Sequence, residues 1–252
     1  MGAWIIDLDG VIWLAGEAIP GSAGAVERLR SSGTDIVFAT NNAEPTRAEL
    51  VQRLARVGIT ASDHEIVSSA DAAASMLEPG SSALACGGAG LVEALTERGV
   101  TIRGKGPVDA VLVGMTRAFD YEMLSRASLA VRAGARLVGT NEDPTHPTPS
   151  GLLPGSGALV AAVATAAQTS PELAGKPHEP MVRLLRERAP KIGLVVGDRP
   201  ATDGLLAKRL GCPFGLVLSG VISPGHGALD VEPDEEDSDL AALVRRRLGS
   251  SS

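Results

Sequence analysis

Aromatic side chains are scarce in this 252-residue sequence, at 2% of its residues, so stacking surfaces for nucleic-acid bases are not expected. A basic face is not expected either, because 30 Asp and Glu outnumber 23 Lys and Arg and give a net charge of −7. No apolar run approaches the roughly 20 residues of a membrane-spanning helix. The nearest run, ALVAAVATAA at 158–167, is too short. We therefore expect neither a nucleic-acid partner nor a membrane span.

Cysteine is rare as well. Cys86 and Cys212 are far apart and match no metal-binding spacing, so we expect two small core residues in a reducing compartment. Asp7 and Asp9 interrupt the first apolar run, and no cationic segment precedes that run, which argues against a secretory signal. These features predict a cytoplasmic protein.

Short, nearly continuous apolar runs alternate with helical patterns along the chain. Such an alternation is typical of an α/β protein with a doubly wound parallel sheet that is covered on both faces. The expected strands include 35–40, 82–88, 109–114, 136–140, 192–198 and 214–220, and expected helices include 22–33, 45–58 and 158–167.

The middle of the chain has its own alternation of strands and helices. We expect residues 70–172 to form an inserted α/β domain, and residues 1–69 and 173–252 to form the core. The acidic run EPDEEDSD at 232–239 is expected to be a solvated turn or the N-terminus of a helix.

Polar side chains follow several of the predicted strands directly. Asp7, Thr40, Asn41 and Asp198 all take such positions. In open α/β sheets, ligands bind outside the carboxyl ends of the strands. The sequence therefore predicts that these residues meet at one crevice.

Two carboxylates two residues apart at the end of a buried strand require a cation or a chemical purpose. Asp7, fixed at the strand end, suits a nucleophile that forms an aspartyl-phosphate. Asp9 suits a general acid for the leaving alkoxide and a general base for water. Gly10 allows the tight turn between them and the next run. The alternative is that both acids merely cap a turn.

Three further residues suit the binding of a phosphate. Thr40 offers a hydroxyl and Asn41 a backbone N–H, and the segment EPTRAEL that follows begins a helix, whose N-terminus favours an anion. Lys176, between Gly175 and Pro177, offers a compact positive charge. The alternatives are an Asn-rich turn with a helix N-cap and an ordinary surface lysine.

Four fragments in order then resemble the motifs of the haloacid dehalogenase superfamily, and more closely its type IIA phosphatases, which include phosphatases of pyridoxal phosphate, phosphoglycolate and 4-nitrophenyl phosphate. They are DLDGV at 7–11, ATNN at 39–42, GKPHEP at 175–180 and VGDRPATD at 196–203. The resemblance implies a Mg²⁺-dependent phosphate-monoester hydrolase with a Rossmann-like core and a cap inserted between the second and third motifs.

The resemblance also implies roles for single residues. The metal ligands would be Asp7, Asp198 and the backbone carbonyl of Asp9. Asp203 would hold a metal-bound water or orient Lys176, unless it is simply an acid in the first turn of a helix. Asn42 would support the loop of the nucleophile.

The segment GTNEDPTHPTPSG at 139–151 resembles the loop of type IIA caps that faces the substrate. The resemblance would place Asn141, Asp143 and His146 near the leaving group, and we expect this segment to be an ordered loop without a helix. Alternatively, Asn141 and Asp143 brace the loop through Asx turns, and His146 is structural.

A small phosphate ester is the expected substrate, with glycerol and sugar phosphates ahead of pyridoxal phosphate, phosphoglycolate and nucleotides. A homodimer that forms through the cap is a further expectation. The rival interpretations are a receiver-type signalling domain, a 2-haloacid dehalogenase, a phosphomutase, and a related protein that binds phosphate without turnover.

Overall fold

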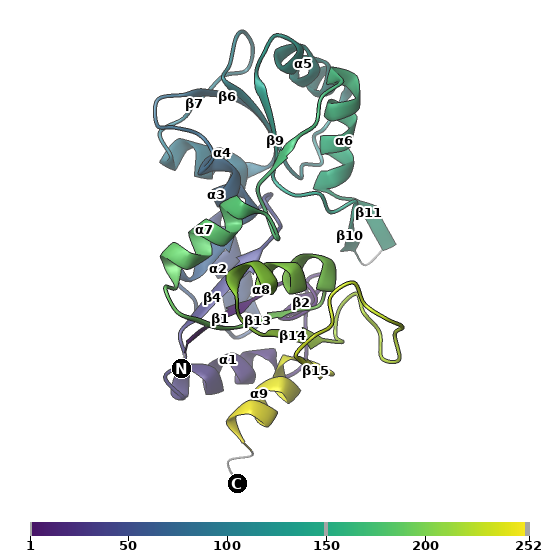
Figure 1. The fold of residues 1–252 in the computed structure, drawn as a ribbon. Coiled ribbons are helices and arrows are strands. Elements are labelled where there is room, and N and C mark those ends of the chain that lie inside the picture. Colours follow the sequence, from purple (N-terminus) through teal and green to yellow (C-terminus); the bar gives the residue numbers. More distant parts are fainter. Residues whose placement is uncertain (1, 149–150, 250–252) are drawn as a thin grey trace. The chain divides into compact units, whose positions relative to one another are not determined.

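The computed structural model describes residues 2–148 and 151–249 (Figure 1). The chain separates into two compact units. Unit 1 comprises Met1–Thr40, Leu50–Val67 and Val182–Ser252, and unit 2 comprises Asn41–Glu49 and Ser68–Met181. The assignment of residues 70–172 to a separate cap stays a prediction.

Unit 1 is built on a six-stranded sheet of parallel pairs, as the apolar runs predict. The adjacent pairs β1–β13, β1–β4, β13–β14 and β14–β15 are all parallel. In spatial order the strands are β15 (Glu235–Asp237), β14 (Phe214–Val217), β13 (Ile192–Gly197), β1 (Ala3–Ile6), β4 (Ile36–Thr40) and β5 (Ile66–Ser68). Strands β13, β1 and β4 are direct neighbours at its centre, so their carboxyl ends share one edge.

Helices cover both faces of this sheet. Figure 1 shows α1 (Ser22–Ser31) and α9 (Leu240–Leu248) along one face and α8 (Leu205–Leu210) along the other. Two further helices, α2 (Arg47–Arg56) and α7 (Glu179–Arg188), begin at residues of unit 2 and end at residues of unit 1. The predicted helices 22–33 and 45–58 correspond to α1 and α2.

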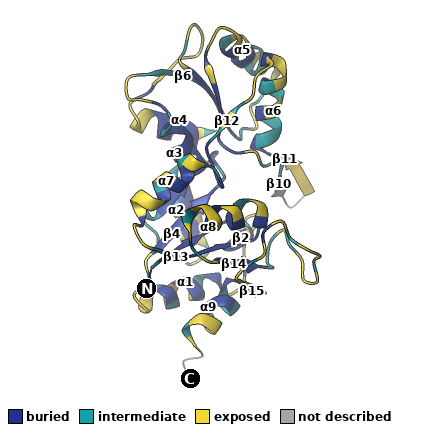
Figure 2. Cartoon of the chain, in the orientation of Figure 1, coloured by how far each residue is buried: buried dark blue, intermediate teal, exposed yellow. Residues whose placement is uncertain are grey.

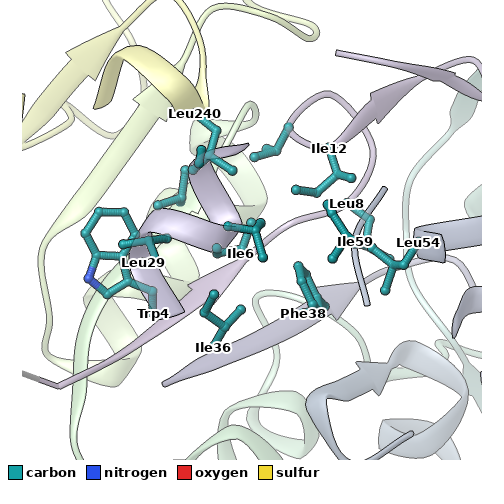
Figure 3. Close-up of a cluster of buried hydrophobic side chains, with 14 of the residues drawn as sticks. Trp4, Ile6, Leu8, Ile12, Leu29, Ile36, Phe38, Leu54, Ile59 and Leu240 are labelled. Atoms are coloured by element: carbon teal, nitrogen blue, oxygen red, sulfur yellow. The ribbon is translucent and has the colours of Figure 1, made fainter. Parts of the chain in front are cut away.

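One hydrophobic cluster joins the sheet of unit 1 to α1, α2 and α9 (Figure 3). Trp4 and Ile6 lie two positions apart on β1 and therefore point to the same face, where Leu29 of α1 also lies. Phe38 of β4 lies beside them and is fully buried. The central strands are buried throughout (Figure 2), which explains why the sequence shows them as continuous apolar runs.

Unit 2 carries its own parallel sheet. Its strand order is β12 (Glu172–Leu173), β9 (Arg136–Gly139), β8 (Ala110–Val113), β6 (Ser82–Cys86) and β7 (Thr101–Ile102). Helices α5 (Tyr121–Arg132) and α6 (Ser156–Ala167) pack on one face through a second hydrophobic cluster. Helices α3 (Ser69–Ala74) and α4 (Ala89–Glu97) lie beside each other on the opposite side in Figure 1.

Two small antiparallel hairpins were not predicted. The first joins β2 (Trp13–Leu14) to β3 (Glu17–Ala18). The second joins β10 (Thr145–Thr148) to β11 (Gly151–Pro154), so the segment expected to be a loop at 139–151 contains a strand; positions 149 and 150 lie outside the described residues. Hairpins this short bury little apolar surface, and they therefore leave no alternating pattern in the sequence.

The acidic run at 232–239 differs in part from its prediction. Glu235–Asp237 form β15, an edge strand, because two arginines of α9 compensate their charge: Arg246 lies 2.6 Å from Asp237, and Arg247 contacts Glu235. The Arg247 guanidinium holds the pKa of the Glu235 carboxyl below its usual value. The last residue of the run provides the expected helix N-terminus: Asp239 accepts the backbone N–H of Ala242 at 2.7 Å and caps α9.

Both cysteines are free thiols. Burial raises the pKa of Cys86 and of Cys212 to about 11, so both thiols are protonated at neutral pH. Across residues 2–148 and 151–249, no helix combines the length and the apolar character needed to cross a membrane.

We predict that Phe38→Ala lowers the free energy of unfolding of unit 1 by about 3–5 kcal/mol, because it leaves a cavity in a fully packed core. The two tryptophans of the chain, Trp4 and Trp13, both belong to this cluster, so their fluorescence during urea unfolding follows unit 1. Leu152→Ala, at a side chain that is 70% exposed, is the control and should change the midpoint little. Equal midpoints for the two variants would contradict the assignment of Phe38 to the core.

Candidate active site

Asp7 stands immediately beyond β1, at the centre of the sheet of unit 1. Its backbone N–H donates to the carbonyl of Val196 on β13 at 2.9 Å, so the strand ladder continues through the residue and fixes its position. The side chain is buried. This placement agrees with the expectation that the sheet presents Asp7 at its carboxyl edge.

Three carboxylates meet at this edge. Asp7, Asp198 and Asp203 each offer one oxygen, and these oxygens lie within 4.8 Å of one another. All three residues are buried, at 7%, 2% and 1% exposure. Like charges this close and this dry repel each other strongly, and a cation bound among them would offset that repulsion.

Asp198 follows β13, and the backbone of two loops approaches its carboxylate closely. The N–H of Val221 donates to its Oδ2 at 2.7 Å. A Cβ on Gly10 or on Gly220 would overlap the Asp198 carboxylate, and Gly10 also has a φ of +87° that side chains rarely adopt. The hydroxyl of Ser219 donates to the carbonyl of Gly10 at 2.7 Å and ties these two loops together.

Asp203 reaches the same edge from the π-helical turn Pro200–Gly204. The backbone N–H of Arg199 donates to its Oδ2 at 3.2 Å. A Cβ on Gly197, the last residue of β13, would overlap the Asp203 side chain, so glycine is required at that position. The structure thus brings Asp203 to the same cluster as Asp198, and its role toward a metal-bound water or Lys176 stays a prediction.

Asp9 and Thr40 also belong to unit 1. Asp9 is half-buried in the turn after β1, where its Oδ1 accepts the indole N–H of Trp13 at 3.0 Å. Thr40 is the last residue of β4 and is buried. Because β4 is the direct neighbour of β1, Thr40 stands at the same edge of the sheet as Asp7.

The remaining predicted residues form a second group, in unit 2. The side chain of Asn41 pairs with the backbone of Lys176: its Oδ1 accepts the Lys176 N–H at 2.8 Å, and its Nδ2 donates to the Lys176 carbonyl at 3.3 Å. A Cβ on Gly175 would crowd Asn41 Oδ1 and the carbonyl of Thr140, which accounts for the glycine before Lys176. Asn41 therefore sets the position of the Lys176 backbone.

Asn141 and Asp143 contact this same asparagine. Asn141 is buried and donates through Nδ2 to the Asn41 carbonyl at 2.6 Å and to Ser156 Oγ at 3.2 Å. Asp143 Oδ2 accepts from Asn41 Nδ2 at 3.0 Å, and the Asp143 N–H donates to Asn141 Oδ1, which is an Asx turn. These contacts brace the loop, and the predicted roles of both residues toward the leaving group stay predictions.

His146 and Asn42 have local partners. His146 lies on β10, where its Nδ1 is 3.2 Å from the carbonyl of Pro154 on β11. Asn42 Oδ1 accepts the backbone N–H of Glu44 at 3.0 Å and so shapes the turn before α2. The predicted roles of His146 toward the substrate and of Asn42 toward the nucleophile loop stay predictions.

Several contributors could not be inferred from the sequence. Trp13, Ser219 and Val221 contact Asp9, Gly10 and Asp198, and Asn41 acts through its side chain as well as its backbone. The run FGLVLSG at 214–220 predicts only a strand, although its final Ser-Gly pair was a signal that something approaches closely there.

The donor set of the cluster fits Mg²⁺. Asp7, Asp198 and Asp203 supply only carboxylate oxygens, and Mg²⁺ prefers hard oxygen ligands from one or two carboxylates together with water and phosphate. Softer ions favour thiolate or imidazole ligands, and none belongs to this group among the described residues.

Comparison with protein families gives two matches. Residues 4–101 match the family described as haloacid dehalogenase-like hydrolase, and residues 173–243 match the one described as HAD-hydrolase-like. The matched ranges contain Asp7, Asp9, Thr40, Asp198 and Asp203.

Relatives resemble most of the chain. The acid sugar phosphatase of Staphylococcus aureus is 37% identical over 228 residues, which covers 87% of each chain. A glycerol phosphate phosphatase from Mycobacterium tuberculosis, solved in complex with magnesium, is 34% identical with a TM-score of 0.88, over 96% of this chain and 76% of that one. A p-nitrophenyl phosphatase from Archaeoglobus fulgidus is 29% identical with a TM-score of 0.89, over 97% and 98%.

We predict that Gly220→Ala weakens Mg²⁺ binding about 10–100-fold, because the added methyl group displaces Asp198 from the cluster. Isothermal titration of the purified protein with MgCl₂ measures this directly. Gly227→Ala is the matched control in the same region, since a Cβ there meets no atom within 4 Å. Unchanged affinity in Gly220→Ala would show that Asp198 does not hold the ion.

Proposed function

We propose, since the chain belongs to the haloacid dehalogenase-like hydrolase family, that it hydrolyses the phosphate monoester of a small sugar or of glycerol through an aspartyl-phosphate on Asp7. It is a phosphatase, and its cofactor is Mg²⁺. The observation that carries the proposal is the buried cluster of Asp7, Asp198 and Asp203, whose oxygens lie within 4.8 Å. A cluster of three buried carboxylates suits an enzyme that gathers a cation and a phosphate dianion at one point.

In the first step, an oxygen of Asp7 attacks phosphorus. The bond between phosphorus and Asp7 forms as the bond to the ester oxygen breaks, and the leaving alkoxide takes a proton from Asp9. A carboxylate nucleophile of this kind divides one difficult displacement into two easier ones. The position of Asp7 in the strand ladder keeps it aligned for the attack.

In the second step, water attacks the phosphorus of the aspartyl-phosphate. Asp9 now accepts the proton of the water, the bond between phosphorus and Asp7 breaks, and inorganic phosphate leaves. Asp9 returns to its protonated form and Asp7 to its carboxylate, so the cycle is balanced. General acid–base work of this kind contributes about 10²–10⁴-fold to a rate.

The reaction also requires that the negative charge on the phosphoryl oxygens is stabilised. Asp7, Asp198, Asp203 and the carbonyl of Asp9 would hold Mg²⁺, which neutralises that charge when it is bound. We assign the Thr40 hydroxyl, the Asn41 backbone N–H and the Lys176 ammonium to the phosphate as donors. The pairing of Asn41 with the Lys176 backbone supports their joint role.

We assign selectivity to a cap formed by residues 70–172. Support comes from the separate sheet and hydrophobic cluster of this segment. The aromatic residues of unit 2 are Phe119, which packs against that cluster, and Tyr121, which is 83% exposed on α5. A flat substrate such as pyridoxal phosphate therefore has few stacking partners, and this favours a polyol phosphate.

Homodimerisation through the cap and a cytoplasmic location complete the proposal. The two free thiols accord with the cytoplasmic location.

We predict that the purified protein releases phosphate from glycerol 3-phosphate or a sugar phosphate only with Mg²⁺. Excess chelator should lower the rate by more than about 100-fold, and added Mg²⁺ should restore it, since the ion supplies several kcal/mol of charge stabilisation. A panel that also contains pyridoxal phosphate, phosphoglycolate and nucleotides ranks the esters. Full activity in chelator, or binding of every ester without turnover, would contradict the proposal.

We predict separate losses for the two acids of the first motif. Asp7→Asn should acquire no covalent phosphate, because an amide cannot replace the nucleophile. Asp9→Asn should still bind Mg²⁺ and slow turnover of an alkyl phosphate about 10²–10⁴-fold. Intact-protein mass spectrometry after rapid acid quench detects the phosphoryl group, and calorimetry measures Mg²⁺ binding. Covalent phosphate on Asp7→Asn would assign the nucleophile to another residue.

A further inference from the structure

We propose that Trp13 is the positioning residue of Asp9, and that its indole N–H fixes which carboxylate oxygen exchanges the proton with the leaving group. The inference rests on the proposed function, because it concerns the general acid of that reaction. It starts from one hydrogen bond that no motif in the sequence predicts: Trp13 Nε1 donates to Asp9 Oδ1 at 3.0 Å.

The backbone between the two residues holds them in this arrangement. The carbonyl of Leu8 accepts the N–H groups of Ile12 at 2.9 Å and of Trp13 at 3.2 Å, and the N–H of Gly10 donates to the Trp13 carbonyl at 2.7 Å. These bonds fold residues 8–13 into a closed turn. The closed backbone turn therefore brings the indole and the carboxylate side by side, and no flexible segment of chain lies between the two residues.

The indole itself cannot move freely. Trp13 is 5% exposed and belongs to the hydrophobic cluster of unit 1. It is also the first residue of β2 and pairs with Ala18 of the neighbouring strand β3. Asp9, by contrast, is only half-buried. A fixed donor thus restrains a more accessible carboxylate, which is what preorganisation of an acid requires.

The chemistry of the donor decides the consequence. An indole N–H donates and does not accept, so the oxygen that it contacts acts as an acceptor. The carbonyl oxygen of a carboxylic acid is the better acceptor of its two oxygens, so the indole contact favours the tautomer of Asp9 that carries the proton on Oδ2. When the ester bond between phosphorus and oxygen breaks, this proton moves from Oδ2 to the leaving oxygen, and the indole bond to Oδ1 persists through the transfer.

The inference makes a distinction between leaving groups. An alkoxide such as that of glycerol must be protonated as it departs, whereas 4-nitrophenolate is stable as an anion and leaves without a proton. Loss of the Trp13 donor should therefore harm an alkyl phosphate much more than 4-nitrophenyl phosphate. The kcat/KM value reports on the steps up to departure of the leaving group, so it isolates the half-reaction in which Asp9 acts as an acid.

The test compares kcat/KM for glycerol 3-phosphate and 4-nitrophenyl phosphate in Trp13→Phe, which keeps an aromatic ring and removes the donor. We expect a fall of about 10–100-fold on glycerol 3-phosphate, part of the full contribution of a general acid, and a fall of at most about threefold on the aryl ester. In an Asp9→Asn background, Trp13→Phe should add no further selectivity between the esters, because the two residues act as one unit.

Trp4→Phe is the matched control. Trp4 is a buried tryptophan of the same cluster, and its ring faces the Arg247 guanidinium at 5.5 Å. The same loss of ring size there should leave the ratio of the two kcat/KM values unchanged. If Trp13→Phe fails to fold, benzothienylalanine at position 13, in which sulfur replaces the N–H, preserves the shape of the side chain and tests the same bond.

Equal losses on both esters, or an equal change of their ratio in Trp4→Phe, would overturn the inference and would leave the proposed function intact. Wild-type protein that hydrolyses neither these two esters nor any sugar phosphate in Mg²⁺ would instead overturn the proposed function, and with it the premise of the inference. A selective loss in Trp13→Phe that is absent in the Asp9→Asn background supports it.

Discussion

Repulsion among three buried carboxylates is the constraint around which the carboxyl edge of the unit 1 sheet is organised. Asp7, Asp198 and Asp203 cannot lie this close in a dry environment at no cost, so the surrounding backbone must hold them against their mutual repulsion. It does so with the strand ladder at Asp7, the Val221 N–H at Asp198 and the Arg199 N–H at Asp203. The backbone in this way directs three carboxylates toward one point, where a bound cation would offset their repulsion.

The same constraint explains what the sequence reveals. The positions of Asp7, Thr40 and Asp198 at the edge of the sheet could be predicted because each ends or directly follows a strand that is buried and therefore appears as a continuous apolar run. The parallel sheet, α1 and α2 follow from the same signal. These are local features, in which side-chain pattern and backbone geometry are coupled within a few residues.

The contacts that complete the site carry no such signal. Ser219 reaches Gly10, and Val221 reaches Asp198, only once the sheet has brought distant parts of the chain together. In the sequence, Trp13 is one more apolar residue of VIWL, and its role as a donor arises only from the closed turn after β1. The sequence suggests a role for the backbone of Asn41, whereas in the structure its side chain also binds the Lys176 backbone. The acidic edge strand β15 was missed because its charges are compensated by α9, which lies later in the chain.

Asp198 and the two glycines that contact it, Gly10 and Gly220, constrain one another, although Gly10 lies far from the other two in the sequence. Aspartate is the shortest acidic side chain, so a methyl group at either glycine cannot be offset by a smaller acid at position 198. None of the three positions can change first without a loss that the other two are unable to repair. The exposed segment after Gly220 is under no such constraint, since a Cβ on Gly227 would meet no atom within 4 Å.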